Sequence, residues 1–137
     1  CKERSSSCMI LAHYADLKAK ELGVIADIIS GCGAGRAYCS IQPDGKVTPC
    51  VYMPELIVGD LRKQPFKEIW EESPVMVSLR DRNGLWGSCG TCQHSAICGG
   101  CRARAYAYFN DLKAPDPGCI NNASYYYQFA ENEKKVA

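Results

Sequence analysis

The chain has 137 residues, enough for one small domain with an attached helix, and its 47% apolar content is ordinary for a globular protein. The formal net charge of +1 lacks the basic excess that nucleic-acid binding usually requires, so we predict no nucleic-acid partner. The sequence has no run of about 18 apolar residues and no basic-then-apolar leader, so we expect no membrane span, no secretory signal and a cytoplasmic location.

Helical and strand patterns alternate in the first part of the chain. Residues 5–23 predict a helix, because apolar residues recur at spacings of three and four and Gly23 can end it. The apolar run 24–29 fits a buried strand or a short buried helix. Residues 38–51 predict a β-hairpin, since the Pro43-Asp44-Gly45 stretch supplies turn chemistry: proline presets φ and glycine accepts a positive φ.

Short helices around a cysteine-dense loop are predicted for the second part. Apolar residues on one face indicate the helices, and Pro65, Ser73 and the Pro115-Asp116-Pro117-Gly118 stretch serve as start and stop signals. Residues 84–101 are loop-like, so ligands rather than an apolar core must fix their fold. The predicted helices are residues 65–72, 73–82, 102–112 and 120–135.

Ten cysteines are far more than a cytosolic protein keeps for packing, and without a secretory leader their clustering favours metal ligation over disulfides. The densest group is Cys89-x2-Cys92-x5-Cys98-x2-Cys101, followed by Cys119. A Cys-x2-Cys loop lets two thiolates approach one metal centre while backbone N–H groups point at the sulfurs. Glycines at positions 90, 99 and 100 suit this role, because they let the backbone come close.

A second group is Cys32-x6-Cys39 with Cys50, which the hairpin would carry back toward the other two. Three thiolates here and five in the denser group equal two sets of four, which fits two cubane clusters or two tetrahedral zinc ions. One cysteine of the denser group must then cross to the other set. The predicted fold class is α+β: a small β-hairpin plus short helices organised around two metal clusters, with little regular sheet.

These spacings, with the string from Ile41 to Cys50 and the string Cys98-Gly99-Gly100-Cys101, resemble the SPASM domain that follows the barrel of many radical SAM enzymes. The resemblance covers residues 31–120, although the family usually has three residues where this chain has two between Cys98 and Cys101. It implies two 4Fe-4S clusters. The implied ligands are Cys32, Cys39, Cys50 and Cys101 for the inner cluster, nearer the active site, and Cys89, Cys92, Cys98 and Cys119 for the outer cluster.

The resemblance also implies what this chain leaves to the rest of a parent enzyme. No three cysteines have the Cys-x3-Cys-x2-Cys spacing of a SAM-cleaving site, so SAM and a third cluster are expected only in a missing N-terminal radical SAM barrel. Residues 1–30 would be a helical segment linking to that barrel, residues 31–120 the SPASM domain and residues 121–137 a C-terminal helical tail.

By the same resemblance, the domain supports electron transfer and substrate positioning in an oxidoreductase or maturase that modifies a peptide, a protein or a cofactor precursor. Its expected partners are the barrel and that peptide, protein or small-molecule substrate. Cys39 either ligates or leaves one iron open to substrate. Two alternatives stay open: a zinc-binding structural or interaction module, and a free-standing two-cluster electron carrier.

Five other side chains need an interpretation. Cys1 and Cys8 lie outside the pattern and are interpreted as free thiols. His94 is interpreted as a solvent-facing loop residue, because the cysteines already fill both sets. Arg102 and Arg104 lie beside ligand cysteines and either balance cluster charge or are surface helix charges.

Overall fold

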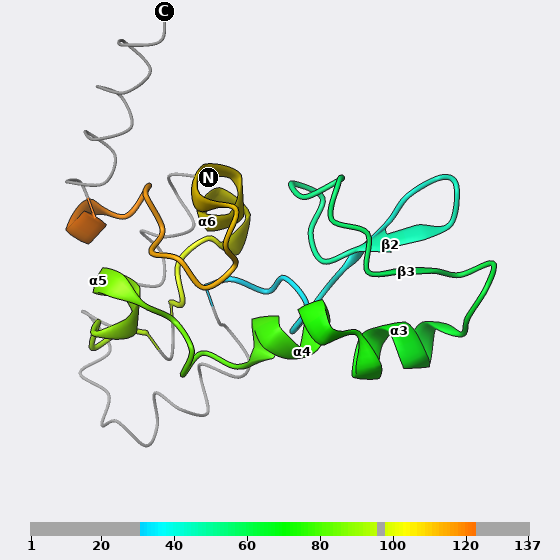
Figure 1. Cartoon of the computed structure of the whole chain (residues 1–137), viewed down its shortest axis with the longest axis horizontal. Coiled ribbons are helices and arrows are strands. Elements are labelled where there is room, and N and C mark those ends of the chain that lie inside the picture. The colour runs from blue at the N-terminus through cyan, green and yellow to red at the C-terminus, as the bar shows by residue number, and fades with distance from the viewer. Residues whose placement is uncertain (1–30, 96–97, 123–137) are drawn as a thin grey trace, which may run out of the picture. The chain divides into compact units, whose positions relative to one another are not determined.

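The computed structural model describes residues 31–95 and 98–122, which belong to two compact units (Figure 1). The first, residues 32–83, is called here the hairpin unit. The second, called the cysteine unit, is residue 31 with the described part of residues 84–122. Outside the described residues lie the predicted helix 5–23, the apolar run 24–29 and most of the predicted helix 120–135.

A three-stranded antiparallel sheet in the order β1-β2-β3 forms the base of the hairpin unit. β1 (Ser40–Ile41) pairs with β2 (Lys46–Thr48). Gly45 takes a φ of +83° in the turn between them, a conformation that strains residues with a Cβ. The hairpin predicted for residues 38–51 is confirmed.

The third strand, β3 (Gly59–Asp60), extends the sheet beyond the predicted hairpin by pairing with the other edge of β2. The N–H groups flanking it, from Val58 and Leu61, donate to the carbonyl oxygens of Val47 and Gly45 at 2.8 and 3.0 Å. One glycine and one aspartate carry no strand pattern. The pairing partner, rather than local propensity, therefore makes this strand.

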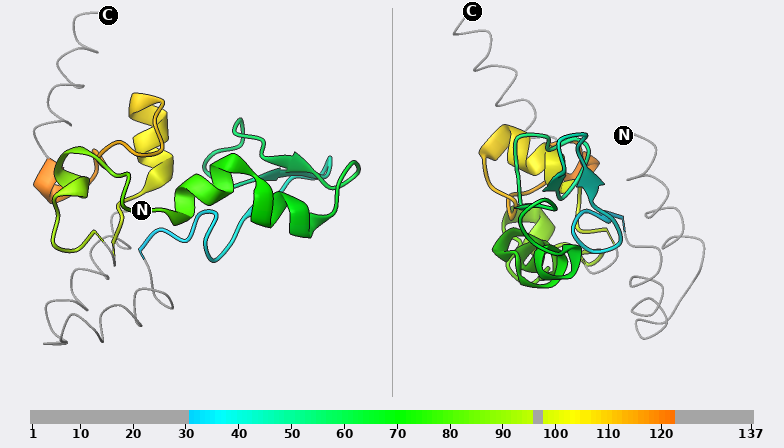
Figure 2. Two further views of the ribbon diagram at one scale, coloured as in Figure 1. Left: turned by 60° about the horizontal axis from the view of Figure 1, so that its bottom comes forward. Right: turned by 90° about the vertical axis from the view of Figure 1, so that its right-hand side faces the viewer.

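Two short helices, α3 (Phe66–Glu72) and α4 (Pro74–Arg80), follow one another along one side of the sheet (Figures 1 and 2). Each begins beside a proline. Proline lacks a backbone N–H, but the first N–H groups of a helix have no acceptor within the helix, so no hydrogen bond is lost. The helices bury Ile69 and Met76 against Val47 of β2, and each such side chain contributes about 1.5–3 kcal/mol. Both predicted helices are confirmed, although α4 ends short of its predicted C-terminus.

The cysteine unit contains a one-turn helix, α5 (Gly87–Gly90), a longer helix, α6 (Arg102–Phe109), and a 3-10 turn, η1 (Ile120–Asn122). The helix predicted for residues 102–112 is confirmed but ends early, because Asn110 takes a left-handed φ of +51°. α5 falls in the stretch interpreted as a loop. Its four residues are too short for a helical pattern in the sequence.

The described residues thus form a mixed α+β fold with a small sheet and short helices, as predicted. The longest described helix, α6, has eight residues. No helix in the described part of the chain is long and apolar enough to cross a membrane.

Candidate metal centre

Four cysteines meet on one cavity of the cysteine unit. They are Cys89, Cys92, Cys98 and Cys119, the set that the resemblance assigns to the outer cluster. The remaining lining residues are serines, glycines and asparagines, so soft metal ligation at this cavity falls to the thiols. The arrangement gathers cysteines from α5, from the loop before α6 and from the segment before η1.

α5 and the turn after it present the first two of these cysteines. A Cβ at Gly90 would lie 2.2 Å from the carbonyl oxygen of Leu85, so glycine is needed for α5 to close on the preceding chain. The predicted close approach at Gly90 is therefore to a carbonyl rather than to a sulfur. Cys89 is buried, while Cys92 is half-buried and its Sγ accepts the His94 backbone N–H at 3.4 Å.

Two consecutive glycines turn the chain between Cys98 and Cys101. Gly99 and Gly100 have φ values of +60° and +64°, which favour glycine. A Cβ at Gly100 would lie 3.3 Å from the Cys89 sulfur. The predicted close approach of backbone to sulfur occurs here, and it crosses from one Cys-x2-Cys unit to the other.

Cys119 lies in the electrostatic field of the other groups on the cavity. Burial raises the pKa of its thiol, and the backbone N–H of Asn121 opposes that rise. The nearby Cys89, Asp116 and Cys92 add further to the increase in its pKa. A neutral thiol is therefore favoured at Cys119 until a cation or metal compensates the negative charge.

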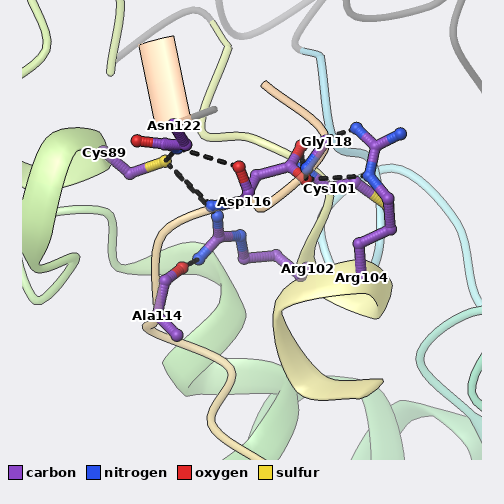
Figure 3. Close-up of polar contacts among 8 residues, drawn as sticks. All are labelled: Cys89, Cys101, Arg102, Arg104, Ala114, Asp116, Gly118 and Asn122. Carbon is purple, nitrogen blue, oxygen red and sulfur yellow. Dashed lines mark hydrogen bonds and ion pairs between the residues drawn. The ribbon is translucent and has the colours of Figure 1, made fainter. Parts of the chain in front are cut away.

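The Cys89 sulfur accepts three N–H groups from different parts of the unit (Figure 3). The backbone N–H of Asp116 donates at 3.3 Å, the Asn122 amide Nδ2 at 3.7 Å and the Arg102 guanidinium at 3.9 Å. Such N–H donors to ligand sulfur are one means by which proteins adjust a cluster's potential. Donors from three separate segments thus converge on one predicted ligand.

Asp116 is the buried centre of this network (Figure 3). Its carboxylate accepts the Cys101 backbone N–H at 2.7 Å and the Gly118 N–H at 2.9 Å. Arg104 donates to both carboxylate oxygens, at 2.8 and 2.6 Å. The Asp116 carbonyl oxygen also accepts the Cys119 N–H at 3.1 Å. One residue therefore positions the backbone near several predicted ligands.

The other predicted ligands divide between the two units. Cys32, Cys39 and Cys50 lie in the hairpin unit, and Cys101 precedes α6 in the cysteine unit. Burial raises the pKa of the Cys39 thiol. Cys50 is buried, with its sulfur 3.6 Å from the Tyr38 hydroxyl. Their common ligation of an inner cluster stays a prediction.

The structure also shows how far Arg102, Arg104 and His94 are buried. Arg102 is buried with 5% of its surface exposed, so its interpretation as a surface charge is wrong. Arg104 pairs with Asp116 and is only partly exposed. His94 is half-buried, with its ring nitrogen beside the Gln93 amide at 3.1 Å. Cys1 and Cys8 lie outside the described residues.

Sequence reasoning missed Asp116 and Asn122. The proline-rich stretch around Asp116 reads as a helix stop, and an asparagine after the last predicted ligand carries no distinctive pattern. The available signal was position alone, because Asp116 lies three residues before Cys119. The contacts that give both residues a role join positions far apart in the sequence.

The comparison with known families agrees with this chemistry. Residues 32–93 match a family model described as an iron-sulfur cluster-binding domain. The match defines the class of this protein: it binds an iron-sulfur cluster. Residues 32–93 thus match a SPASM domain, which confirms the resemblance recognised in the cysteine spacing.

Curated relatives extend the likeness over more of the chain. The AdoMet-dependent heme synthases of Methanosarcina barkeri and Nitratidesulfovibrio vulgaris are 47% and 43% identical over 66% and 78% of this chain. The mycofactocin maturase of Mycobacterium ulcerans is 36% identical over 79% of it. The chain spans 26%, 32% and 29% of these relatives' own lengths, so it corresponds to about a quarter to a third of each.

The residues of the cavity fit such a cluster. Four thiols border one space, N–H groups point at two of the sulfurs, and a buried guanidinium lies beside one. In the described part of the chain, no three His, Cys, Asp or Glu side chains are arranged to hold a single metal ion. The four thiols equal in number the ligands of one cubane cluster.

Proposed function

We propose that this chain is the auxiliary-cluster domain of a larger radical SAM enzyme and holds two 4Fe-4S clusters. The observation that carries the proposal is the cavity on which Cys89, Cys92, Cys98 and Cys119 meet. Four thiolates match the ligand number of one cubane cluster. The N–H groups directed at Cys89 and Cys92 support the same assignment, since hydrogen bonds to the ligand sulfurs are a feature of iron-sulfur sites.

The second cluster would be held by Cys32, Cys39, Cys50 and Cys101. This part of the proposal rests on the family resemblance and on the number of cysteines left after the first quartet. Cys50 is buried and Cys39 packs beside the apolar core, as suits ligands of a shielded cluster. Whether Cys39 completes the set or leaves one iron open decides if this cluster can bind substrate.

The proposed role is to pass one electron between substrate and cluster and to help position the substrate. A bound iron-sulfur cluster supplies one-electron transfer. This chain's own residues hold the ligands in place: α5 presents Cys89, and Asp116 fixes the backbone at Cys101 and Cys119. The SAM-cleaving site would belong to the barrel of the parent chain.

The names of the relatives support a class of substrate. Those named for heme or pre-heme d1 synthesis are 38–47% identical, and those named mycofactocin maturases are 33–36% identical. We therefore favour a cofactor precursor as the substrate of the parent enzyme, with a heme-type precursor ahead of a peptide-derived one. Testing each precursor with the full-length enzyme, and following its consumption, separates the two.

Anaerobic reconstitution tests the cluster proposal directly. The proposal predicts about eight iron atoms and about eight acid-labile sulfides per chain, with the broad visible absorbance of cubane clusters. About four iron atoms and about four sulfides per chain would support one cluster and contradict the second. Zinc alone, in protein kept free of oxygen, would favour the structural-module alternative and contradict the proposal.

A further inference from the structure

Arg102 is a buried cation without a carboxylate partner in the described part of the chain. Its Nη1 donates to the carbonyl oxygens of Leu112 and Ala114 at 2.9 and 2.8 Å. Its Nη2 lies 3.9 Å from the Cys89 sulfur, and its Nε has no hydrogen-bond partner. Carbonyl dipoles orient this guanidinium, and the Asp111 carboxylate interacts with its charge without forming an ion pair with it.

A buried guanidinium needs an anion, since an uncompensated charge of this kind costs several kcal/mol. Asp111 interacts with the guanidinium electrostatically, but the Cys89 sulfur is the potential anion within hydrogen-bonding reach, and the approach depends on Gly100. A Cβ at Gly100 would lie 2.7 Å from Arg102 Nη2 and 3.3 Å from the Cys89 sulfur. Figure 3 shows the guanidinium held between Cys89 and the Ala114 carbonyl.

We propose that Arg102 is a positioning residue that raises the reduction potential of the cluster bound by Cys89, through a fixed positive charge at that ligand. The inference rests on the proposed function. Reduction adds one negative charge to a cluster, and a nearby cation stabilises the reduced state more than the oxidised state. Because Arg102 is buried, water and salt screen this interaction only weakly.

The substitutions Arg102→Gln and Arg102→Lys separate the charge from the shape of the side chain. Gln removes the charge and keeps a polar, donating group, whereas Lys keeps the charge. We expect Arg102→Gln to shift the midpoint potential of one cluster to a more negative value, and Arg102→Lys to remain close to wild type. Arg62→Gln is the matched control, because Arg62 is exposed on the hairpin unit and its loss should move neither potential.

The experiment is a redox titration of the anaerobically reconstituted full-length protein, followed by electron paramagnetic resonance. The cluster in question is identified as the one whose signal disappears in Cys92→Ser. A negative shift confined to that signal in the Gln variant, with Lys near wild type, supports the proposal. Iron retained by the Lys variant but lost from the Gln variant also supports it, since charge is then what the site needs.

Three results would overturn the inference. They are an unchanged potential in the Gln variant with full iron content, equal shifts in the Gln and Lys variants, and loss of iron from both alike. The last two would assign Arg102 to holding the backbone of residues 112–114. If the wild-type protein itself took up no cluster, the proposed function would fail first, so the two failures are distinguishable.

Discussion

The two units of this chain are stabilised in different ways. The hairpin unit buries an apolar cluster of Val47, Ile69 and Met76, the usual kind of small-domain core. The cysteine unit buries Arg102, Asp116 and Asn122 beside small alanines, and its thiols face a cavity. A polar interior of this kind orients groups well but contributes little hydrophobic free energy.

The contrast shows where ligation matters most. A segment with few apolar contacts cannot offset the conformational entropy of its residues by burial alone, so metal binding becomes part of its folding free energy. The hairpin unit is stabilised by its own apolar core. We therefore expect the two units to respond differently to loss of ligands and to loss of core volume.

The largest expected effect is loss of one cavity thiolate. Cys92→Ala should remove about four iron atoms per chain and abolish amide protection across residues 84–122. Protection in β2 should persist. Iron analysis combined with hydrogen exchange measures both, and Cys1→Ala should match wild type. Equal behaviour of the two variants would contradict the assignment of Cys92 as a ligand.

The next effect tests the polar interior. Asp116→Asn keeps the size of the side chain but leaves the half-buried Arg104 without its ion pair, and a polar group left unsatisfied in this way costs about 1–3 kcal/mol. The expected result is a lower unfolding free energy for the cysteine unit, measured by hydrogen exchange of α6 amides. Glu68→Gln, at an exposed carboxylate in α3, should leave those amides unchanged. If Glu68→Gln lowered the protection of the α6 amides as much as Asp116→Asn does, the cause would be a general effect of charge.

Loss of apolar core volume should destabilise the hairpin unit rather than the cysteine unit. Ile69→Ala leaves a cavity between α3 and β2, so the unfolding free energy of the hairpin unit should fall by about 2–5 kcal/mol. Phe66→Ala, one turn earlier and more exposed, should cost much less. Hydrogen exchange of β2 amides reports the change. Loss of protection in α6 to the same extent would show that the two units unfold as one.

The smallest effect concerns the hairpin turn. Gly45→Ala meets only the flexible Arg62 side chain, at 3.4 Å or more, so its penalty comes from the positive φ and is about 1 kcal/mol. The free energy of unfolding, from denaturant titration, should fall by that amount with iron content unchanged. A loss of iron would mean that the turn also supports a cluster.

Local chemistry explains what the sequence could predict. The hairpin, α3 and α6 follow from turn residues, prolines and apolar spacing within each segment, and the cysteine spacing identified the family. β3 and α5 were not predictable, because each depends on a partner distant in sequence or is too short for a pattern. Asp116 escaped notice for the same reason, since its contacts reach back to Cys89 and Cys101.

The central claim is that Cys89, Cys92, Cys98 and Cys119 hold one iron-sulfur cluster. An anaerobic crystal structure of the reconstituted protein, with anomalous data collected at the iron edge, tests this claim most directly. The account predicts a compact group of iron peaks in the cavity, bonded to these four sulfurs. Disulfides between them, a single zinc ion, or iron bound without these cysteines would contradict it.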